Sequence, residues 1–347
     1  MDILILSIFA IVVVLSFVED YMPSWQKIPI LIGICICMVC IAGFKPLSTT
    51  DARTYEYYYY FNYNPIIELA TEPTYIYLSR LFVSFGWKVG AIFLAYAIMA
   101  IPMKLVILWK TTPYIFTALI VYVGIYYPLH DIVQIRCGVA VGFLLWAMIP
   151  LAKRHYFKAT VLTICAILFH YSSVAFLPLL VVGNMRIGKY WKYLLASAVP
   201  ICLTLYVMGF SAVSFIPNSL VEGKLDLYRD MSETGNLDEY VPYKQIPFFA
   251  EFILLYFFIF FYETIEKYCV YAPILIKILV LELACMIMFA EIPVLGARLH
   301  ELFGMFNVIA YTCCLYCIKP RYVARIGITL FCFAFYLHQM LYHLYFH

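Results

Sequence analysis

The stretch "KATVLTICAILFHYSSVAFLPLLVV", residues 158–182, decides how this chain must fold. It is long enough to cross a bilayer once, but the polar run "HYSS" interrupts it near the middle. Basic segments flank it on both sides, at 153–158 and 184–192, and short loops rich in Lys and Arg stay on the cytoplasmic side of a membrane. Both ends of the stretch therefore face one side, and each half is too short to span. These features predict a re-entrant pair of half-helices that meet near His170.

Composition indicates a polytopic membrane protein. The 347 residues are 65% hydrophobic and 12% charged, whereas soluble domains average about 25% charged. A net charge of +3 is too small and too scattered to predict a nucleic-acid partner. The twelve cysteines lie mostly within apolar runs, where Cys behaves as a small hydrophobe, so we expect no disulfide, no metal site and no cofactor.

Apolar runs predict an all-α fold with about ten full transmembrane helices and one helical domain over residues 1–347. The expected spans are 3–18, 28–44, 88–109, 113–128, 132–152, 190–210, 247–262, 270–290, 297–318 and 322–342. Residues 74–86 are too short to cross, and they predict a short amphipathic helix on the outer face.

A third basic loop, at 319–325, completes the assignment of sides. With all three basic loops cytoplasmic, the segments 45–87 and 211–246 lie outside. The second of these carries six acidic and three basic residues, which suits a non-cytoplasmic loop. We expect both outer loops to form part of a site or a lid over it.

Arginines gather at the outer depth of the predicted bundle, where the distribution of charge in membrane proteins disfavours them. They are Arg53, Arg80, Arg136 and Arg298. Arg keeps its charge in any protein environment and binds phosphate through two hydrogen bonds. Together with His170 at the tip of the re-entrant pair, these side chains predict a site for an anionic substrate.

Each of these residues also has a structural interpretation. An arginine near a helix end often extends its guanidinium toward lipid headgroups. Alternatively, Arg80 pairs with Glu72 and Arg136 pairs with Asp131, as ordinary salt bridges.

A tyrosine-rich stretch, "STTDARTYEYYYYFNYNP" at 48–65, lies on the same face. Tyrosines at a membrane boundary are typical of an interfacial belt. The belt does not explain the nearby carboxylates, and aromatic rings beside carboxylates suit a carbohydrate, since rings stack on sugars and carboxylates accept their hydroxyl hydrogens. We therefore expect a lipid-linked glycan as substrate. The predicted glycan contacts are Tyr55, Tyr58, Glu72 and Asp131.

Five segments, in order, resemble the EpsG-type, Wzy-like polysaccharide polymerases over about residues 40 to 320. They are "TTDARTYEYYYYF", "EPTYIYLSRLF", "DIVQIRCGVAVGFLLWA", "CAILFHYSSVAFLPLLVV" and "GARLHELFGMF". The chain departs from the family pattern at Lys45, where the family has Arg, and at Cys137, where it commonly has Gln.

The resemblance implies a bacterial inner-membrane glycosyltransferase of the GT-C-like membrane polymerase type, with its active site facing the periplasm. It would join undecaprenyl-diphosphate-linked repeat units of an O-antigen, in lipopolysaccharide biosynthesis, or of a capsule, by metal-independent, inverting transfer. The four arginines would then bind the diphosphate, and His170 or Asp51 would be the catalytic base. A separate chain-length-regulating co-polymerase is the implied protein partner, beside the donor and acceptor glycolipids and the bilayer.

Three alternatives stay open at this point. An O-antigen ligase or another lipid-glycan transferase uses the same donor with a different acceptor. A lipid-linked glycan flippase or transporter would show paired broken helices in repeated halves, and the sequence shows no repeat. A scaffold in an export complex would leave each arginine dispensable.

Overall fold

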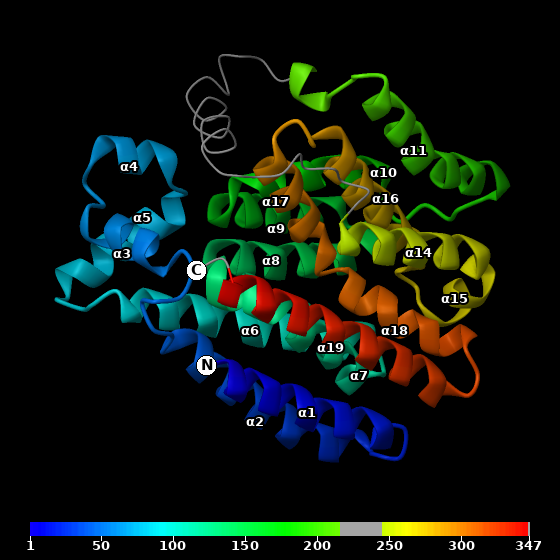
Figure 1. Ribbon diagram of the computed structural model, residues 1–347, viewed down its shortest axis with the longest axis horizontal. Coiled ribbons are helices and arrows are strands. Elements are labelled where there is room, and N and C mark those ends of the chain that lie inside the picture. The colour runs from blue at the N-terminus through cyan, green and yellow to red at the C-terminus, as the bar shows by residue number, and fades with distance from the viewer. Residues whose placement is uncertain (216–244, 346–347) are drawn as a thin grey trace. The chain divides into compact units, whose positions relative to one another are not determined.

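The computed structural model describes residues 1–215 and 245–345, and all regular elements within these ranges are helices (Figure 1). The predicted all-α class is thus confirmed for the described part of the chain. Most of the outer loop predicted at 211–246 lies outside the described residues. The helices before the gap are α1 (Asp2–Val18), α2 (Ser24–Gly43), α3 (Ala52–Tyr60), α4 (Pro65–Ala70), α5 (Pro73–Ser84), α6 (Gly90–Thr111), α7 (Ile115–Val121), the π-helix η1 (Tyr122–Val133), α8 (Ile135–Ala152), α9 (Tyr156–Phe169), the 3₁₀ helix η2 (Tyr171–Phe176), α10 (Leu177–Val182), α11 (Lys189–Val207) and η3 (Ala212–Phe215). Those after it are α14 (Ile246–Phe260), α15 (Tyr262–Tyr268), α16 (Ala272–Met288), α17 (Pro293–Gly304), α18 (Asn307–Cys317) and α19 (Arg321–Tyr345).

Five helices among the described residues are long and apolar enough to cross a membrane. They are Ser24–Gly43, Gly90–Thr111, Ile115–Val133, Ile135–Ala152 and Lys189–Val207. A sixth arises if α14 and α15, which are bent by 83° at their junction, count as one span.

The predicted number of ten full spans is not confirmed. Two of the expected spans, 3–18 and 270–290, are the 17-residue helices α1 and α16. At about 1.5 Å per residue, such a helix falls short of the roughly 30 Å hydrocarbon core. The expected span 297–318 divides into α17 and α18, which are shorter still.

The structure confirms the predicted break at His170 but not the predicted boundary at 129–131. The chain does break at His170, which has extended backbone angles between α9 and η2. Whether this segment re-enters the bilayer stays a prediction. The expected spans 113–128 and 132–152 leave a loop at 129–131, and this boundary is wrong, because the π-helix η1 continues the preceding helix to Val133. A buried salt bridge of Asp131 with Lys104 keeps this turn inside the bundle.

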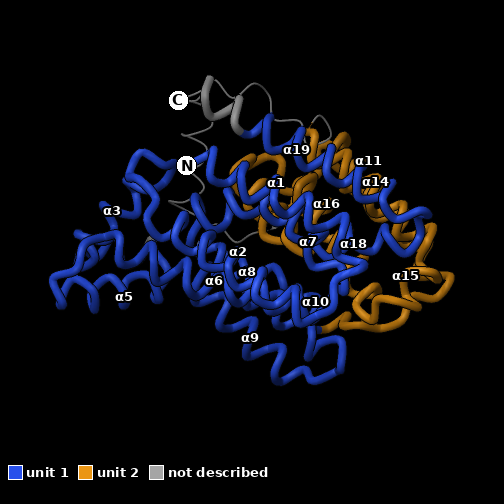
Figure 2. Tube along the Cα trace, turned by 90° about the horizontal axis from the view of Figure 1, so that it is seen from below, with its two compact units in different colours: residues 1–180, 308–347 blue, residues 181–307 orange. Residues whose placement is uncertain are grey.

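Contacts divide the chain into two compact units (Figure 2). Unit 1 comprises Met1–Leu180 and Val308–His347, and unit 2 comprises Val181–Asn307. In unit 1, α8 packs against α6 and α9, and α6 packs also against α2. In unit 2, α16 packs against α11, α14 and α17. The single domain expected from the sequence stays a prediction.

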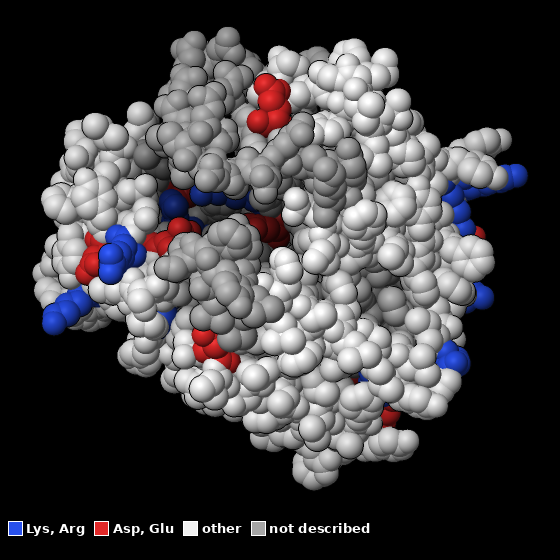
Figure 3. Space-filling view, viewed as in Figure 1, with Lys and Arg blue, Asp and Glu red and all other residues white. Residues whose placement is uncertain are grey.

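Apolar side chains form much of the surface. In Figure 3 most residues on the visible face are neither acidic nor basic. Only 11% of the apolar window of Lys189–Val207 is buried, against 89% of that of Ile115–Val133. A helix that is apolar yet exposed is suited to lipid contact, whereas Ile115–Val133 forms the interior of unit 1.

Candidate active site

A buried carboxylate, Glu72, joins two of the predicted site residues within unit 1. Its Oε1 lies 2.9 Å from Nδ1 of His170, and its Oε2 accepts a hydrogen bond from Nη1 of Arg136. The three side chains come from distant positions: the residue before α5, the first turn of α8, and the break after α9. We call Glu72, Arg136 and His170, with the rings around them, the Glu72 cluster.

The local sequence fixes Glu72 in place. Pro73 starts α5 and restricts the residue before it to extended angles, which Glu72 adopts. One residue further, the Thr74 hydroxyl donates a 2.8 Å hydrogen bond to the carbonyl oxygen of Leu168, near the end of α9. The beginning of α5 is thus attached directly to the end of the helix that precedes His170.

Tyrosines enclose the guanidinium of Arg136. Its carbon lies 5.3 Å from the ring centre of Tyr55 and 5.9 Å from that of Tyr75. The Tyr75 hydroxyl donates to the Tyr55 carbonyl oxygen, and the Tyr96 ring packs against Tyr75. All three tyrosines are at most 5% exposed. Rings at this distance stabilise the cation and exclude water from it.

The tyrosines of α3 fall into a buried and an exposed group, according to their position around the helix. In α3, Tyr55 and Tyr59 lie four residues apart and are buried, whereas Tyr57 and Tyr60 are exposed. Tyr58, a predicted glycan contact, is partly buried and packs against the same core as Tyr55. The exposed tyrosines of α3 fit the interfacial belt, and the buried ones fit the site.

The carboxyl of Glu72 stays ionised far below neutral pH. Burial alone would raise its pKa, but the Arg136 charge and the hydrogen bond with His170 lower that pKa to about 2. An ionised carboxylate accepts hydrogen bonds only, so Nδ1 of His170 carries the proton in this contact. In a neutral imidazole the other nitrogen, Nε2, is then an acceptor, and the structure gives it no hydrogen bond within the described residues.

One buried donor of this cluster, Nε of Arg136, lacks a hydrogen-bond partner among the described residues. Native proteins leave few buried donors unpaired, so this group requires an explanation. A bound substrate with an acceptor oxygen would provide the missing partner.

The structure corrects both salt bridges expected from the sequence. Arg80 pairs with Glu68 at 2.8 Å, not with Glu72, and this pair is partly exposed. Arg136 pairs with Glu72, not with Asp131. Arg136 and Glu72 are 64 residues apart in the sequence, so no local pattern could predict their contact.

Asp131 is placed in the interior, away from the predicted glycan. Its side chain is fully buried, and its two oxygens lie 2.8 and 2.9 Å from Nζ of Lys104. The Tyr122 hydroxyl donates a further hydrogen bond to it. This arrangement supports a structural role between α6 and η1. Lys104 lies within the predicted span 88–109, and a charged residue inside a span is a sequence signal for a buried partner of opposite charge.

Two of the remaining predicted residues belong to unit 1 but lie outside the Glu72 cluster. Asp51 and Arg53 are exposed at the start of α3, and Asp51 has left-handed backbone angles. Arg298 is exposed on α17, which belongs to unit 2. The convergence of four arginines thus stays a prediction.

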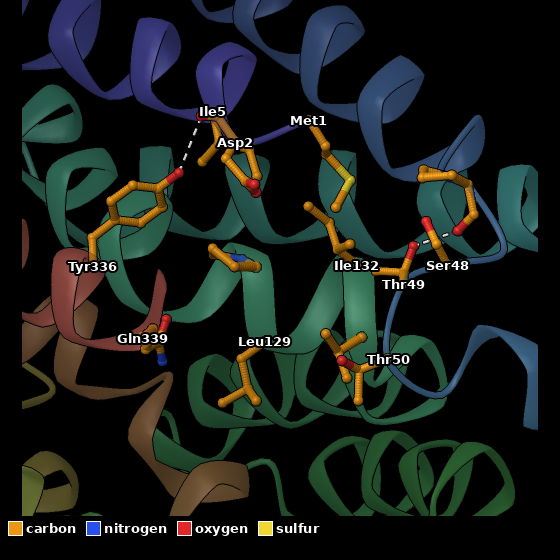
Figure 4. A pocket seen from close by; sticks show the side chains of 13 residues that line it. Met1, Asp2, Ile5, Ser48, Thr49, Thr50, Leu129, Ile132, Tyr336 and Gln339 are labelled. Atoms are coloured by element: carbon orange, nitrogen blue, oxygen red, sulfur yellow. Dashed lines mark hydrogen bonds between the residues drawn. The ribbon is translucent and has the colours of Figure 1, made fainter. Parts of the chain in front are cut away.

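A cavity of about 610 Å³ lies in unit 1, and Pro46, the residue after Lys45, belongs to its lining (Figure 4). Loop residues Ser48, Thr49 and Thr50 contribute hydroxyl groups to its wall, and most of the other lining side chains are apolar. Lys45 donates a hydrogen bond to the carbonyl oxygen of Ile132, which also lines the cavity. Burial lowers the pKa of Lys45 to about 8, although the Asp51 charge acts in the opposite direction.

Lys45 connects this cavity to the Glu72 cluster, since its Nζ lies 5.5 Å from the ring centre of Tyr55. Segment 45–87 thus contributes residues to the cavity wall, to the aromatic rings and to the centre of the Glu72 cluster.

Comparison with known proteins adds one decisive observation. The sequence pattern of the EpsG family matches residues 28–347. The chain therefore belongs to the EpsG family. This is a family of Wzy-like polysaccharide polymerases, so the resemblance seen in the sequence is confirmed. No curated protein and no solved structure matches the chain. Membership of the EpsG family, together with the apolar helices, supports a membrane-bound polymerase of glycosyltransferase type.

Proposed function

We propose that this EpsG-family protein polymerises undecaprenyl-diphosphate-linked oligosaccharide repeat units at the periplasmic face of the bacterial inner membrane. The observation that carries this proposal is the contact of one buried carboxylate, Glu72, with both Arg136 and His170. It supplies a fixed cation and an oriented imidazole in one aromatic enclosure.

His170 is the proposed base. Glu72 holds the proton on Nδ1, so Nε2 accepts the proton of the acceptor sugar hydroxyl. The hydroxyl oxygen forms the new bond to the anomeric carbon of the donor, and the bond from that carbon to the diphosphate breaks. A single displacement of this kind inverts the anomeric configuration. Asp51 stays a second candidate for the base.

Arg136 is the proposed electrostatic catalyst. Undecaprenyl diphosphate leaves with additional negative charge, and the unpaired Nε–H of Arg136 is available as a donor to it. A preorganised donor of this type contributes about 3 kcal/mol to transition-state stabilisation. This step needs no metal. Arg53, Arg80 and Arg298 are proposed to assist in binding the diphosphate, and a chain-length-regulating co-polymerase is the proposed partner.

The test is a gel profile of the surface polysaccharide in the native host, with the gene deleted and then restored as wild type, Arg136→Ala or His170→Ala. We expect deletion to reduce the ladder to a single repeat unit, and neither variant to restore it at normal membrane levels. Arg186→Ala is the matched control, because Arg186 forms an exposed pair with Glu266 in a basic loop. Loss of all surface glycan on deletion, including the single unit, would instead assign the protein to flipping or ligation.

A further inference from the structure

A second cluster of buried ionisable side chains lies wholly within unit 2. Glu251 comes from α14, Glu282 from α16 and His300 from α17, and all three are buried. One potential ligand atom from each residue lies within 4.8 Å of the others. Nε2 of His300 contacts Oε2 of Glu251 and lies 3.6 Å from Oε1 of Glu282.

When both carboxylates are ionised, no cationic side chain within the described residues balances their charge. Asn307 donates hydrogen bonds of 3.1 and 3.0 Å to the two oxygens of Glu282, but an amide carries no charge. No Lys or Arg of the described chain contacts either carboxylate. A protonated His300 would still leave one negative charge in excess. An unpaired charge inside a protein costs several kcal/mol, so a cation is the simplest remedy.

We propose that Glu251, Glu282 and His300 bind one divalent transition-metal ion such as Zn²⁺ or Mn²⁺. Carboxylate oxygens with an imidazole nitrogen are a common ligand set for these ions, and two carboxylates neutralise a 2+ charge. Because the ligands come from three separate helices, the ion would connect α14, α16 and α17. The proposed glycosyl transfer uses no metal, so the assigned role of the ion is to stabilise unit 2.

The competing explanation is a proton shared between the two carboxylates. An amide imitates a protonated carboxyl, so Glu282→Gln would leave a proton-sharing cluster nearly intact. The same substitution removes a charged ligand from a metal site and weakens ion binding by at least roughly tenfold.

The experiment uses the full chain in lipid nanodiscs, treated with a chelator and then equilibrated with Zn²⁺, Mn²⁺ or Mg²⁺. Bound metal is measured by mass spectrometry and stability by thermal unfolding. We expect one transition-metal ion per wild-type chain and a higher Tm when it is bound. Glu282→Gln and His300→Ala should lose both effects. Glu263→Gln, which removes only an exposed partner of Lys192, should retain them.

Two results would overturn the proposal. One is a wild-type chain that takes up none of these ions. The other is a Glu282→Gln variant that binds as much metal as the wild type. In the first case, an unchanged Tm for Glu282→Gln would assign the cluster to a shared proton.

Discussion

Glu72→Gln changes one atom of the side chain and removes the charge at the centre of the Glu72 cluster. The pKa of Glu72 falls from its ordinary 4.5 to about 2. Since one pKa unit corresponds to about 1.4 kcal/mol, the folded protein stabilises the ionised carboxyl by about 3 kcal/mol. The variant also leaves Arg136 buried without a counter-ion. We expect a total loss of about 3–5 kcal/mol in the free energy of unfolding at pH 7.

The same substitution has a defined pH signature. The folded-state pKa lies below the unfolded one, so the stabilisation is complete above about pH 4.5 and is lost as the pH falls toward 2. The wild type should lose this stability over that range. The variant should lack this component of the pH dependence, because glutamine does not titrate.

Thermal unfolding in nanodiscs from pH 2 to 7 measures the stability effect, and single-turnover transfer between synthetic lipid-linked glycans measures the rate. We expect at least about a 100-fold lower rate, because His170 loses its orienting carboxylate. Glu68→Gln is the matched control for stability: it removes only a partly exposed pair with Arg80, so we expect a Tm close to that of the wild type. A Glu72→Gln protein with wild-type rate and the same acid profile would refute the reasoning.

Three further substitutions test the surroundings of the cluster. Between pH 8 and 10.5, folded Lys45 has lost its proton and unfolded Lys45 retains it, so the free energy of unfolding of the wild type should rise by about 3 kcal/mol over this range. Lys45→Met should abolish this rise. Parallel pH profiles of unfolding for the two proteins would contradict the prediction. Lys104→Met alone should lower the free energy of unfolding by about 3–5 kcal/mol, because it leaves Asp131 unpaired. Combining it with Asp131→Asn should recover most of this loss. Additive losses in a double-mutant cycle would contradict the buried pair. Arg136→Lys should keep the positive charge beside Glu72 but lose the Nε donor. We therefore expect a near-normal Tm and a rate of glycosyl transfer lower by about 100-fold. A wild-type rate would exclude that donor from the reaction.

Local patterns in the sequence were sufficient for the helical class and for the break at His170. Both depend on features within a few residues: the length of an apolar run, and a polar run that interrupts it. The number of ten spans is not confirmed, because apolar composition does not show where a helix ends. Segment 297–318 reads as one hydrophobic run but contains two short helices.

The partners of the ionisable residues could not be predicted. The sequence indicated Arg136, His170 and Glu72 separately, yet their contacts join residues 64 and 98 positions apart. Glu251 and Glu282 lie inside expected spans, and a carboxylate in an apolar run is a signal that deserved a functional interpretation. Only the packing of α14, α16 and α17 brings these side chains and His300 together.

The hydrogen bond from Thr74 to Leu168 has a mechanical consequence. It fastens the first turn of α5 to the end of α9, while Glu72, two residues before Thr74, holds the imidazole of His170, two residues after Leu168. Two contacts so close together in both segments fix the start of α5 relative to the residues around His170. Any displacement of the start of α5 should therefore carry Glu72 and His170 together and keep the carboxylate–imidazole contact intact. If His170 acts as the proposed base, such a displacement would leave its orientation by Glu72 unchanged.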